Sequence, residues 1–266
     1  MGPVARNSLQ AGIRIRRRRR ALGAAGSAAA VAAIAVAIPA VTGALGHTAA
    51  VPSTGVPPVP VVYAVNKISG TVTPITTATG TAGRPIKVGF RPRAIAITPD
   101  GKTAYVANKD DTVTPITTAT GRPGQPIRVG GAPYGIAITP DGKTAYVANL
   151  GSDTVTPITT ATGKPGRPIK VGFRPRVIAI TPDGKTAYVA SFEPGRVTPI
   201  STATNKPGKP ITVGSGAWAI AITPDGKTAF VVSFYPATVT PISTATNMAG
   251  KPIKVGRLPF AIAITP

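Results

Sequence analysis

Few side chains in this sequence could act as an acid, a base or a nucleophile. The 266 residues include no Cys and a single His, His47, which lies beside an N-terminal leader segment. The lack of Cys excludes disulfides, thiolate nucleophiles and Cys-ligated zinc. Four of the eight acidic residues lie outside a repeated turn: Asp110, Asp111, Asp153 and Glu193. Catalysis by proton transfer needs a positioned acid or base. We therefore predict no catalytic residue, no metal and no cofactor.

Arginine and aromatic side chains offer binding chemistry instead. A guanidinium group presents forked donors to a carboxylate or phosphate, and an aromatic face presents a stacking surface to a sugar or a base. The residues that we predict to bind a ligand are Arg91, Arg93, Tyr134, Arg174, Arg176, Trp218, Arg257 and Phe260. The alternative is that the rings fill gaps between structural units and the arginines keep the surface soluble. The elements that carry these residues decide whether they meet.

One structural unit is copied along the chain after residue 60. Thr-Pro-Asp-Gly begins at Thr98, Thr139, Thr181 and Thr223, and a last Thr-Pro begins at Thr265, so the steps are 41, 42, 42 and 42 residues. A fixed period of this length indicates an array of similar units. Pro and Gly set a tight turn in each copy, and we expect its Asp to accept backbone N–H groups. Shared metal binding is not favoured, because copies in different units lie too far apart for one ion.

Each unit predicts four short strands. In one copy they cover residues 94–98, 104–108, 112–116 and 126–129, named strands A to D from the inside outward. They are rich in Val, Ile, Thr and Tyr and are bounded by turn residues, and no stretch after the leader has apolar residues at helical spacing. Four strands in about 42 residues is the period of a β-propeller blade. We predict an all-β fold, a single β-propeller of four-stranded antiparallel blades over residues 61–266.

These repeats resemble the YVTN family of β-propellers. The resemblance rests on Ile-Thr-Pro-Asp-Gly-Lys-Thr-Ala-Tyr-Val-Ala-Asn at 97–108 and 138–149, and on Thr-Val-Thr-Pro-Ile at 71, 112, 154 and 238. It implies a YncE-like, surface-layer-type propeller, a scaffold of many extracytoplasmic proteins. Two departures are Ser191 and Ser233, which replace the family's Asn, and a smaller number of blades than family members often carry. Some propellers that this chain resembles are lactonases or dehydrogenases, so an enzyme of that type is the alternative function.

The strands of the blade with which the two ends of the repeat region align predict five blades. Val61–Asn66 aligns with strand B and Ala261–Thr265 aligns with strand A, which gives twenty strands in total. We predict that the C-terminal strand A pairs with the N-terminal strand B and closes the ring, since closure removes free sheet edges. The alternative is that the sequence is a truncated piece of a longer array.

Two sets of loops differ among the copies. They are the B-to-C loops and the D-to-A loops, and they carry the predicted binding residues. Because strand direction alternates in an antiparallel sheet, both sets leave the blades at the same end. We predict that this end forms one basic, aromatic loop face.

The N-terminal 50 residues are predicted to be a signal peptide or a membrane anchor. Residues 1–20 contain seven Arg and no acid, and 26 uncharged residues follow at 21–46. Their length favours an anchor, whereas the many Ala and Gly residues suit cleavage. A twin-arginine signal at Arg19–Arg20 lacks the usual flanking residues. Both main routes place the rest of the chain outside the cytoplasm, after a Pro-rich linker at 51–60.

The charge of the remainder points to an anionic partner. Seven of the 30 cationic residues lie in the leader, so 23 cations face eight acids and the net charge is +15. Such a charge attracts polyanions over long range. We expect a monomeric binding or scaffold module, secreted or anchored in the cytoplasmic membrane, that engages an anionic wall polymer, glycan or protein at the cell surface. Nucleic acid is not favoured, because no recognition motif accompanies the charge.

Overall fold

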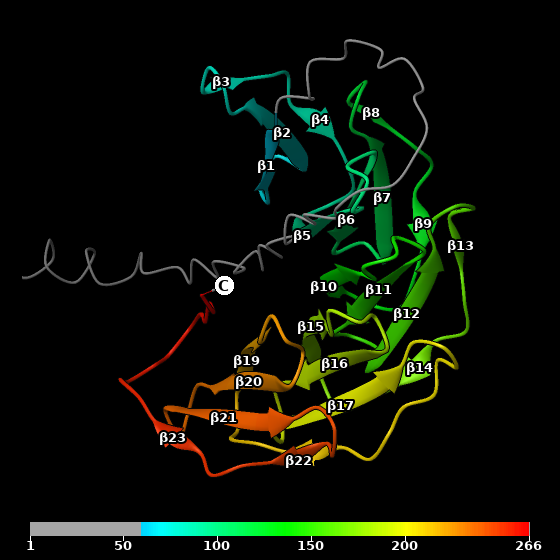
Figure 1. The fold of residues 1–266 in the computed structure, drawn as a ribbon. Helices are drawn as coiled ribbons and strands as arrows, with labels where there is room; N and C mark the ends of the chain where they lie inside the picture. The colour runs from blue at the N-terminus through cyan, green and yellow to red at the C-terminus, as the bar shows by residue number, and fades with distance from the viewer. Residues whose placement is uncertain (1–59, 266) are drawn as a thin grey trace, which may run out of the picture. The chain divides into compact units, whose positions relative to one another are not determined.

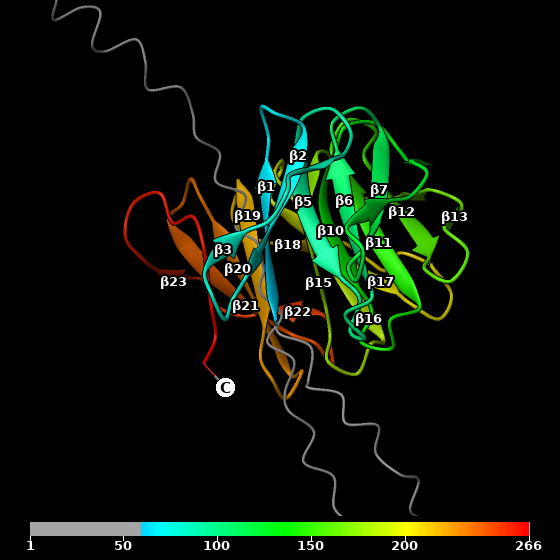
Figure 2. The same cartoon turned by 90° about the horizontal axis from the view of Figure 1, so that it is seen from above.

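The computed structural model describes residues 60–265, which form five antiparallel β-sheets, the blades (Figures 1 and 2). This confirms the predicted all-β propeller architecture of about five blades. Predictions for residues 1–50 and for the linker at 51–60, apart from Pro60, lie outside the described residues. Within residues 60–265, no helix could span a membrane.

Each blade is built from strands of six residues that pair with their neighbours in the chain. Four blades begin with an inner strand: β5 (Pro92–Ile97), β10 (Pro133–Ile138), β15 (Pro175–Ile180) and β19 (Ala217–Ile222). The second strands are β1 (Val61–Asn66), β6 (Thr103–Asn108), β11 (Thr144–Asn149), β16 (Thr186–Ser191) and β20 (Thr228–Ser233). The third strands are β2 (Thr71–Thr76), β7 (Thr112–Thr117), β12 (Thr154–Thr159), β17 (Arg196–Ser201) and β21 (Thr238–Ser243). In Figure 1 the inner strands lie toward the middle and the later strands toward the rim.

The outer strand of a blade differs from the prediction, because in most blades it consists of two short pieces. The pieces are β3 (Thr81–Ala82), β4 (Ile86–Lys87), β8 (Arg122–Pro123), β9 (Ile127–Arg128), β13 (Lys164–Pro165), β14 (Ile169–Lys170), β18 (Ile211–Thr212), β22 (Met248–Ala249) and β23 (Ile253–Lys254). In the second blade, β8 pairs with Ile116–Thr117 and β9 with Thr112–Val113 of β7. Pro115 lies between these pairings and has no N–H to donate, which interrupts the outer strand at that point.

The predicted closure of the ring is not observed. Residues 261–265 form no strand, and within the described residues β1 pairs with β2 but with no inner strand. The complete inner strands pair with the strand that follows them through a short turn, which is a local contact. Residues 261–265 would instead have to pair with the opposite end of the described chain, and closing such a long loop costs more conformational entropy. The exposed Val62, which is 52% accessible, marks the uncovered side of β1.

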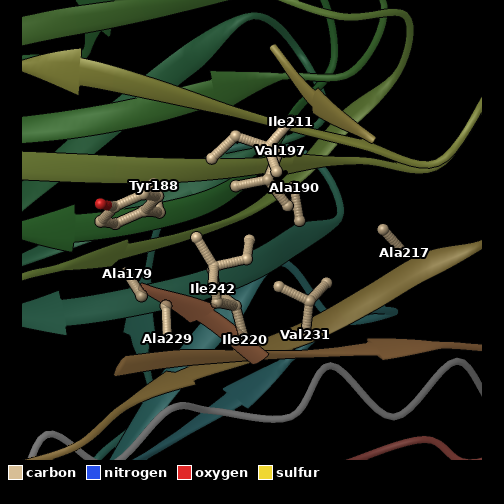
Figure 3. Packing of buried hydrophobic residues seen from close by; sticks show 10 residues of the cluster. All are labelled: Ala179, Tyr188, Ala190, Val197, Ile211, Ala217, Ile220, Ala229, Val231 and Ile242. Atoms are coloured by element: carbon tan, nitrogen blue, oxygen red, sulfur yellow. The ribbon is translucent and has the colours of Figure 1, made fainter. Parts of the chain in front are cut away.

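The hydrophobic core lies between successive blades. One cluster joins Tyr188, Val197 and Ile211 of the fourth blade to neighbours from the fifth, including Ile220 and Ile242 (Figure 3). Three similar clusters lie at the preceding junctions. In each, bulky residues of one blade pack on the Ala and Val residues of the next second strand. Burying these apolar faces holds neighbouring blades together.

Two sets of side-chain hydrogen bonds recur from blade to blade, one device within each turn and one device between blades. In the first turn the Thr98 hydroxyl and the Lys102 backbone N–H both donate to Asp100 Oδ1, at 2.6 and 3.0 Å, and the other three turns repeat this geometry. The predicted capping role of the turn Asp is therefore confirmed. Between blades, the Tyr188 hydroxyl donates to Asn247 Oδ1 at 2.6 Å. The first device fixes each turn, and the second joins the second strand of one blade to the outer loop of the next.

Candidate functional site

The candidate site begins with a β-bulge at the start of each inner strand. The register between inner and second strands shifts between Pro92 and Ala94, and the later blades shift at the same place. A bulge leaves one residue without a ladder partner and re-aims its side chain. The residues at this position are Arg93, Tyr134, Arg176 and Trp218, and Phe260 occupies the equivalent position in the last copy. One residue per copy is thus presented at the same end of the fold.

These five side chains form a continuous stack, which we call the arginine–aromatic row. The guanidinium carbons of Arg93 and Arg176 each lie 5.0 Å from the centroid of the Tyr134 ring. Arg176 also lies 4.3 Å from the Trp218 centroid, and Trp218 lies 4.8 Å from Phe260. All these distances fall within the range of cation–π and aromatic pairing. The structure therefore brings together five of the eight predicted binding residues.

A second group of rings from the loops after the second strands covers the row. Phe192 lies 4.5 Å from Arg176 and is 9% exposed, and its ring meets Trp218 edge-on at 5.8 Å. Phe234 lies 5.7 Å from Trp218. Tyr235 contacts both Phe192 and Phe234 and is 67% exposed. The rings therefore enclose Arg176 on several sides, while Tyr235 remains open to a ligand.

The two guanidinium groups of the row have buried N–H donors without an acceptor. Nη1 of Arg93 and both Nε and Nη1 of Arg176 are buried, and they have no hydrogen-bond partner among the described residues. Burial lowers the pKa of Arg176 below its ordinary value, and the positive charges of Arg174 and Arg93 lower it further. Burial likewise lowers the pKa of Arg93. A guanidinium stays protonated at neutral pH, so this end of the propeller carries two crowded cations with unused N–H donors.

Acidic residues near the row are engaged elsewhere. Asp110 accepts the Phe90 backbone N–H at 2.9 Å, Asp111 accepts that of Ala132 at 2.7 Å, and Asp153 accepts that of Arg174 at 2.8 Å. Within residues 60–265, the four ion pairs join a turn Lys to a turn Asp and involve no Arg. These aspartates tie the two loop sets to each other, which confirms that both sets lie at one end. They leave the row without an internal counter-ion.

The remaining three predicted residues do not join the row. Arg91 stacks on the neighbouring Phe90 at 5.2 Å and is exposed. Arg174 is partly buried and has a φ of 55°, and its described hydrogen bond is the backbone contact to Asp153. Arg257 is exposed. Arg91 and Arg174 add positive charge beside Arg93 and Arg176, and none of the three residues contributes to the stack.

Close approach of the inner strands depends on one glycine. A Cβ on Gly135 would overlap the backbone carbonyl oxygen of Arg176 on the next inner strand. Gly135 directly follows Tyr134, so the missing side chain lets β10 approach β15 where Tyr134 meets Arg176. Sequence comparison did not mark this position or the bulge. The row residues themselves were predicted, and their repeated place as the second residue of each inner strand is the signal that could have revealed the bulge.

Comparisons with known proteins agree with the fold. A model of the YNCE-like β-propeller family matches residues 22–141. Among proteins with curated descriptions, none matches the chain. Among solved structures, hydrazine synthase of Kuenenia stuttgartiensis is similar at 30% identity and a TM-score of 0.60, over 62% of this chain and 49% of that one. This chain therefore spans about half the length of the hydrazine synthase chain.

Two further solved structures are similar in fold. A protein of unknown function from Desulfotomaculum acetoxidans DSM 771 has 19% identity and a TM-score of 0.69, over 76% of this chain and 68% of that one. The dihydro-heme d1 dehydrogenase NirN, in complex with DHE, has 17% identity and a TM-score of 0.65, over 77% and 46%. At these identities the similarity is one of fold.

Proposed function

We propose that this chain, a β-propeller with YncE-like repeats, is an extracytoplasmic binding module that engages an anionic cell-surface polymer or protein through the arginine–aromatic row. One observation carries the proposal: the row holds two guanidinium groups whose buried N–H donors have no acceptor in the described residues. Carboxylates and phosphates are the groups that accept forked hydrogen bonds from Arg. Both residues are only partly buried, so a rotation of their guanidinium groups on binding would expose these donors, and an oxyanion of the partner would then supply the missing acceptors and the missing charge.

The arrangement of the row also favours an anion over a neutral ligand. Arg93 and Arg176 come from the blades before and after that of Tyr134, and their guanidinium carbons lie at equal distances from its ring. The rings reduce the local dielectric constant, which strengthens the attraction of the guanidinium groups for an anion. Arg91 and Arg174 extend the positive charge to the surrounding loops, where it would steer an anionic partner toward the row.

The alternative of a lactonase- or dehydrogenase-type enzyme has less support. Asp110, Asp111 and Asp153 each accept a backbone N–H group from a neighbouring loop. Their positions are explained by holding the loops, and Glu193 is an exposed side chain. A binding role requires no acid or base, whereas proton transfer does. Residues 1–50, as a signal or anchor, would deliver the module outside the cytoplasm.

Trp218 provides a direct test, because it is the chain's single Trp and belongs to the row. Polygalacturonate and inorganic polyphosphate are titrated separately into the purified protein while Trp emission is recorded. We expect a saturable change in emission with at least one polymer. An Arg93→Gln/Arg176→Gln variant should lose this change, whereas Arg257→Gln, which removes an exposed cation outside the row, should keep it. The proposal would be refuted if neither polymer changed the Trp emission, or if the double variant showed the same change as the parent protein.

A further inference from the structure

The outer edges of the blades carry a second concentration of positive charge, separate from the row. Each outer segment runs from the third strand to the next loop, at residues 77–88, 118–129, 160–171, 202–213 and 244–255. Together the five segments contain eleven cations and no acid. The cations are Arg84, Lys87, Arg122, Arg128, Lys164, Arg167, Lys170, Lys206, Lys209, Lys251 and Lys254, and all are exposed. Nearly half of the 23 cations that follow the leader thus lie on these edges.

The outer segments of all five blades share one backbone contact. A Gly near the middle of each segment donates its N–H to the carbonyl of the Pro in the third strand, as Gly124 does to Pro115 at 2.7 Å. The residue after this Gly is Arg or Lys in four blades and Gln125 in the second. This shared contact places the side chain after the Gly at the same point of each blade. The cationic side chains of the edge therefore recur once per blade.

Neighbouring edges are also continuous. The Cα atoms of β4 approach those of β8 within 8 Å, and β9 approaches β13 in the same way. Lys87 at the end of β4 therefore lies near the strand that contains Arg122, and Arg128 lies near the strand that contains Lys164. The positive charge passes from one blade to the next without an intervening acid.

A crevice lies at each of these two junctions. The crevice between the first and second blades has a volume of about 490 Å³ and is lined by Arg84, Lys87, Thr118 and Thr120 among others. The crevice between the second and third blades has a volume of about 600 Å³, and its lining includes Gln125, Arg128, Thr160 and Thr162. Such volumes accommodate a small-molecule-sized group.

Threonine hydroxyls add hydrogen-bonding capacity to the crevices. The Thr120 hydroxyl accepts the Arg122 backbone N–H, and the Thr162 hydroxyl accepts that of Lys164, both at 3.3 Å. Each of these O–H groups can still donate to a ligand oxygen. The crevices therefore combine cationic groups with O–H donors, a combination that suits a hydroxylated unit bearing an oxyanion.

We infer that the outer edge binds a linear polymer with one negatively charged group on each hydroxylated unit, and that units of this polymer occupy the two crevices. Lys and Pro at sheet edges also prevent edge-to-edge aggregation. That role alone does not require a single sign of charge, because Asp and Glu would serve as well. The uniform sign and the crevices are explained by an anionic ligand. This surface is distinct from the row and binds independently of it.

The test compares the full-length protein with two variants that lose the same charge. The edge variant carries Arg84→Gln, Lys87→Gln, Arg122→Gln and Arg128→Gln. The control carries Lys102→Gln, Lys143→Gln, Lys185→Gln and Lys227→Gln, whose lysines lie beside turn aspartates. Affinity for ten-unit and two-unit oligogalacturonates, and for poly(glycerol phosphate), is measured by calorimetry at several salt concentrations. Binding of one polymer identifies the anionic group as a carboxylate or a phosphodiester, and binding of both shows that either is accepted.

We expect the edge variant to bind the longer polymer about tenfold more weakly. Its affinity should also depend less on salt, because the variant makes fewer contacts with phosphate or carboxylate groups and its binding therefore releases fewer counter-ions. The control should change less than about threefold by the same reasoning, and the two-unit ligand should bind weakly to all proteins. Equal losses in edge variant and control, equal affinity for short and long ligands, or no binding of either polymer would overturn the inference.

Two further measurements separate this surface from the row. In the Arg93→Gln/Arg176→Gln background, which removes any binding at the row, the four edge substitutions should still weaken binding of the ten-unit ligand about tenfold, and the absence of any further loss would place the polymer on the row instead. Chemical acetylation of the unaltered protein avoids any effect of substitution on folding. The polymer should protect Lys87, Lys164 and Lys170 from acetylation but not Lys102 or Lys143, and equal protection of both groups would contradict the inference.

Discussion

At the scale of single residues, we expect the row to cost stability, because the proposed binding of an anion requires donors that are unpaired in the free protein. Arg176 carries two buried N–H donors without an acceptor, and a buried unsatisfied donor costs about 1–3 kcal/mol. A substitution that removes the donors and preserves the apolar contacts should therefore stabilise the protein while abolishing anion binding.

We predict that Arg176→Met raises the free energy of unfolding by about 1 kcal/mol, because Met keeps contact with the surrounding rings and leaves no buried donor unpaired. Urea unfolding checks the value. Arg257→Met, at an exposed position, should stay within about 0.5 kcal/mol of the parent. A clear loss of stability in Arg176→Met would mean that the guanidinium is already satisfied in the unliganded protein.

Gly135 is the second residue whose role can be measured. Gly135→Ala should lower the free energy of unfolding by about 1–3 kcal/mol, because the added methyl meets a backbone carbonyl that cannot move aside easily. Gly256→Ala is the matched control, since a Cβ there has no neighbour within 4 Å. Chemical denaturation of both variants gives the comparison. Equal stability of the two would contradict the close approach of β10 and β15.

At the scale of elements, the repeated turn links stability to pH. Hydrogen bonds from the Thr hydroxyl and the Lys backbone N–H hold the pKa of Asp100, Asp141, Asp183 and Asp225 below the usual value. A carboxyl whose folded pKa is depressed contributes stability above its unfolded pKa, near 3.9, and loses it as the pH falls through the folded value. The turns should therefore weaken in acid.

Replacing the four turn aspartates by Asn should reduce the loss of stability between about pH 5 and pH 2, because the amide oxygen can still accept both hydrogen bonds but does not titrate. Stability is measured by urea unfolding at a series of pH values. Four Asp→Ala substitutions serve as the comparison, and they should lower stability at pH 7 as well. If the Asn variant loses stability in acid as steeply as the parent, the turn carboxylates are not responsible.

The hydrogen bond between blades can be isolated with a double-mutant cycle. Tyr188→Phe should cost about 1 kcal/mol by removing the bond to Asn247. Asn247→Gly is the suitable partner change, because Asn247 has a φ of 56° that Gly tolerates. In the Tyr188→Phe background, Asn247→Gly should cost less than it does alone. Strict additivity of the two changes would show that the bond contributes nothing to stability.

At the scale of the whole molecule, most of the architecture is predictable from the repeat. The period near 42 residues and the strand-rich composition give the blades, and the positions of Pro and Gly give the turns. The face that carries the row follows from antiparallel alternation, which places Arg93, Tyr134, Arg176 and Trp218 at one end. These features are predictable because each depends on local residues.

Features that depend on contacts distant in sequence were not predicted correctly or were missed. Residues 261–265 match an inner strand in sequence, yet they form no strand, because their predicted partner, β1, lies at the opposite end of the described chain. The bulge that aims Arg176 at Trp218 is a register shift between two strands, which residue types alone do not reveal. The split of the outer strand follows from Pro115 and its equivalents, a signal that was present in the sequence.

Hydrogen exchange tests the open edge of the first blade. We predict that the backbone amides of β1 exchange faster than those of β11, because β11 is covered by strands on both sides and β1 on one. Mass spectrometry of peptides spanning residues 61–66 and 144–149 provides the measurement. Equal protection of the two peptides would indicate that an inner strand does cover β1 in solution.

We propose that the guanidinium groups of Arg93 and Arg176 bind an oxyanion of the partner. Nuclear magnetic resonance of the arginine Nε–H groups, assigned through Arg→Lys variants, observes them directly during titration with polygalacturonate and polyphosphate. The account predicts that one of these polymers shifts the Arg93 and Arg176 signals together and slows the exchange of their protons with water. Signals of these two residues that stay unchanged while the polymer binds would contradict it.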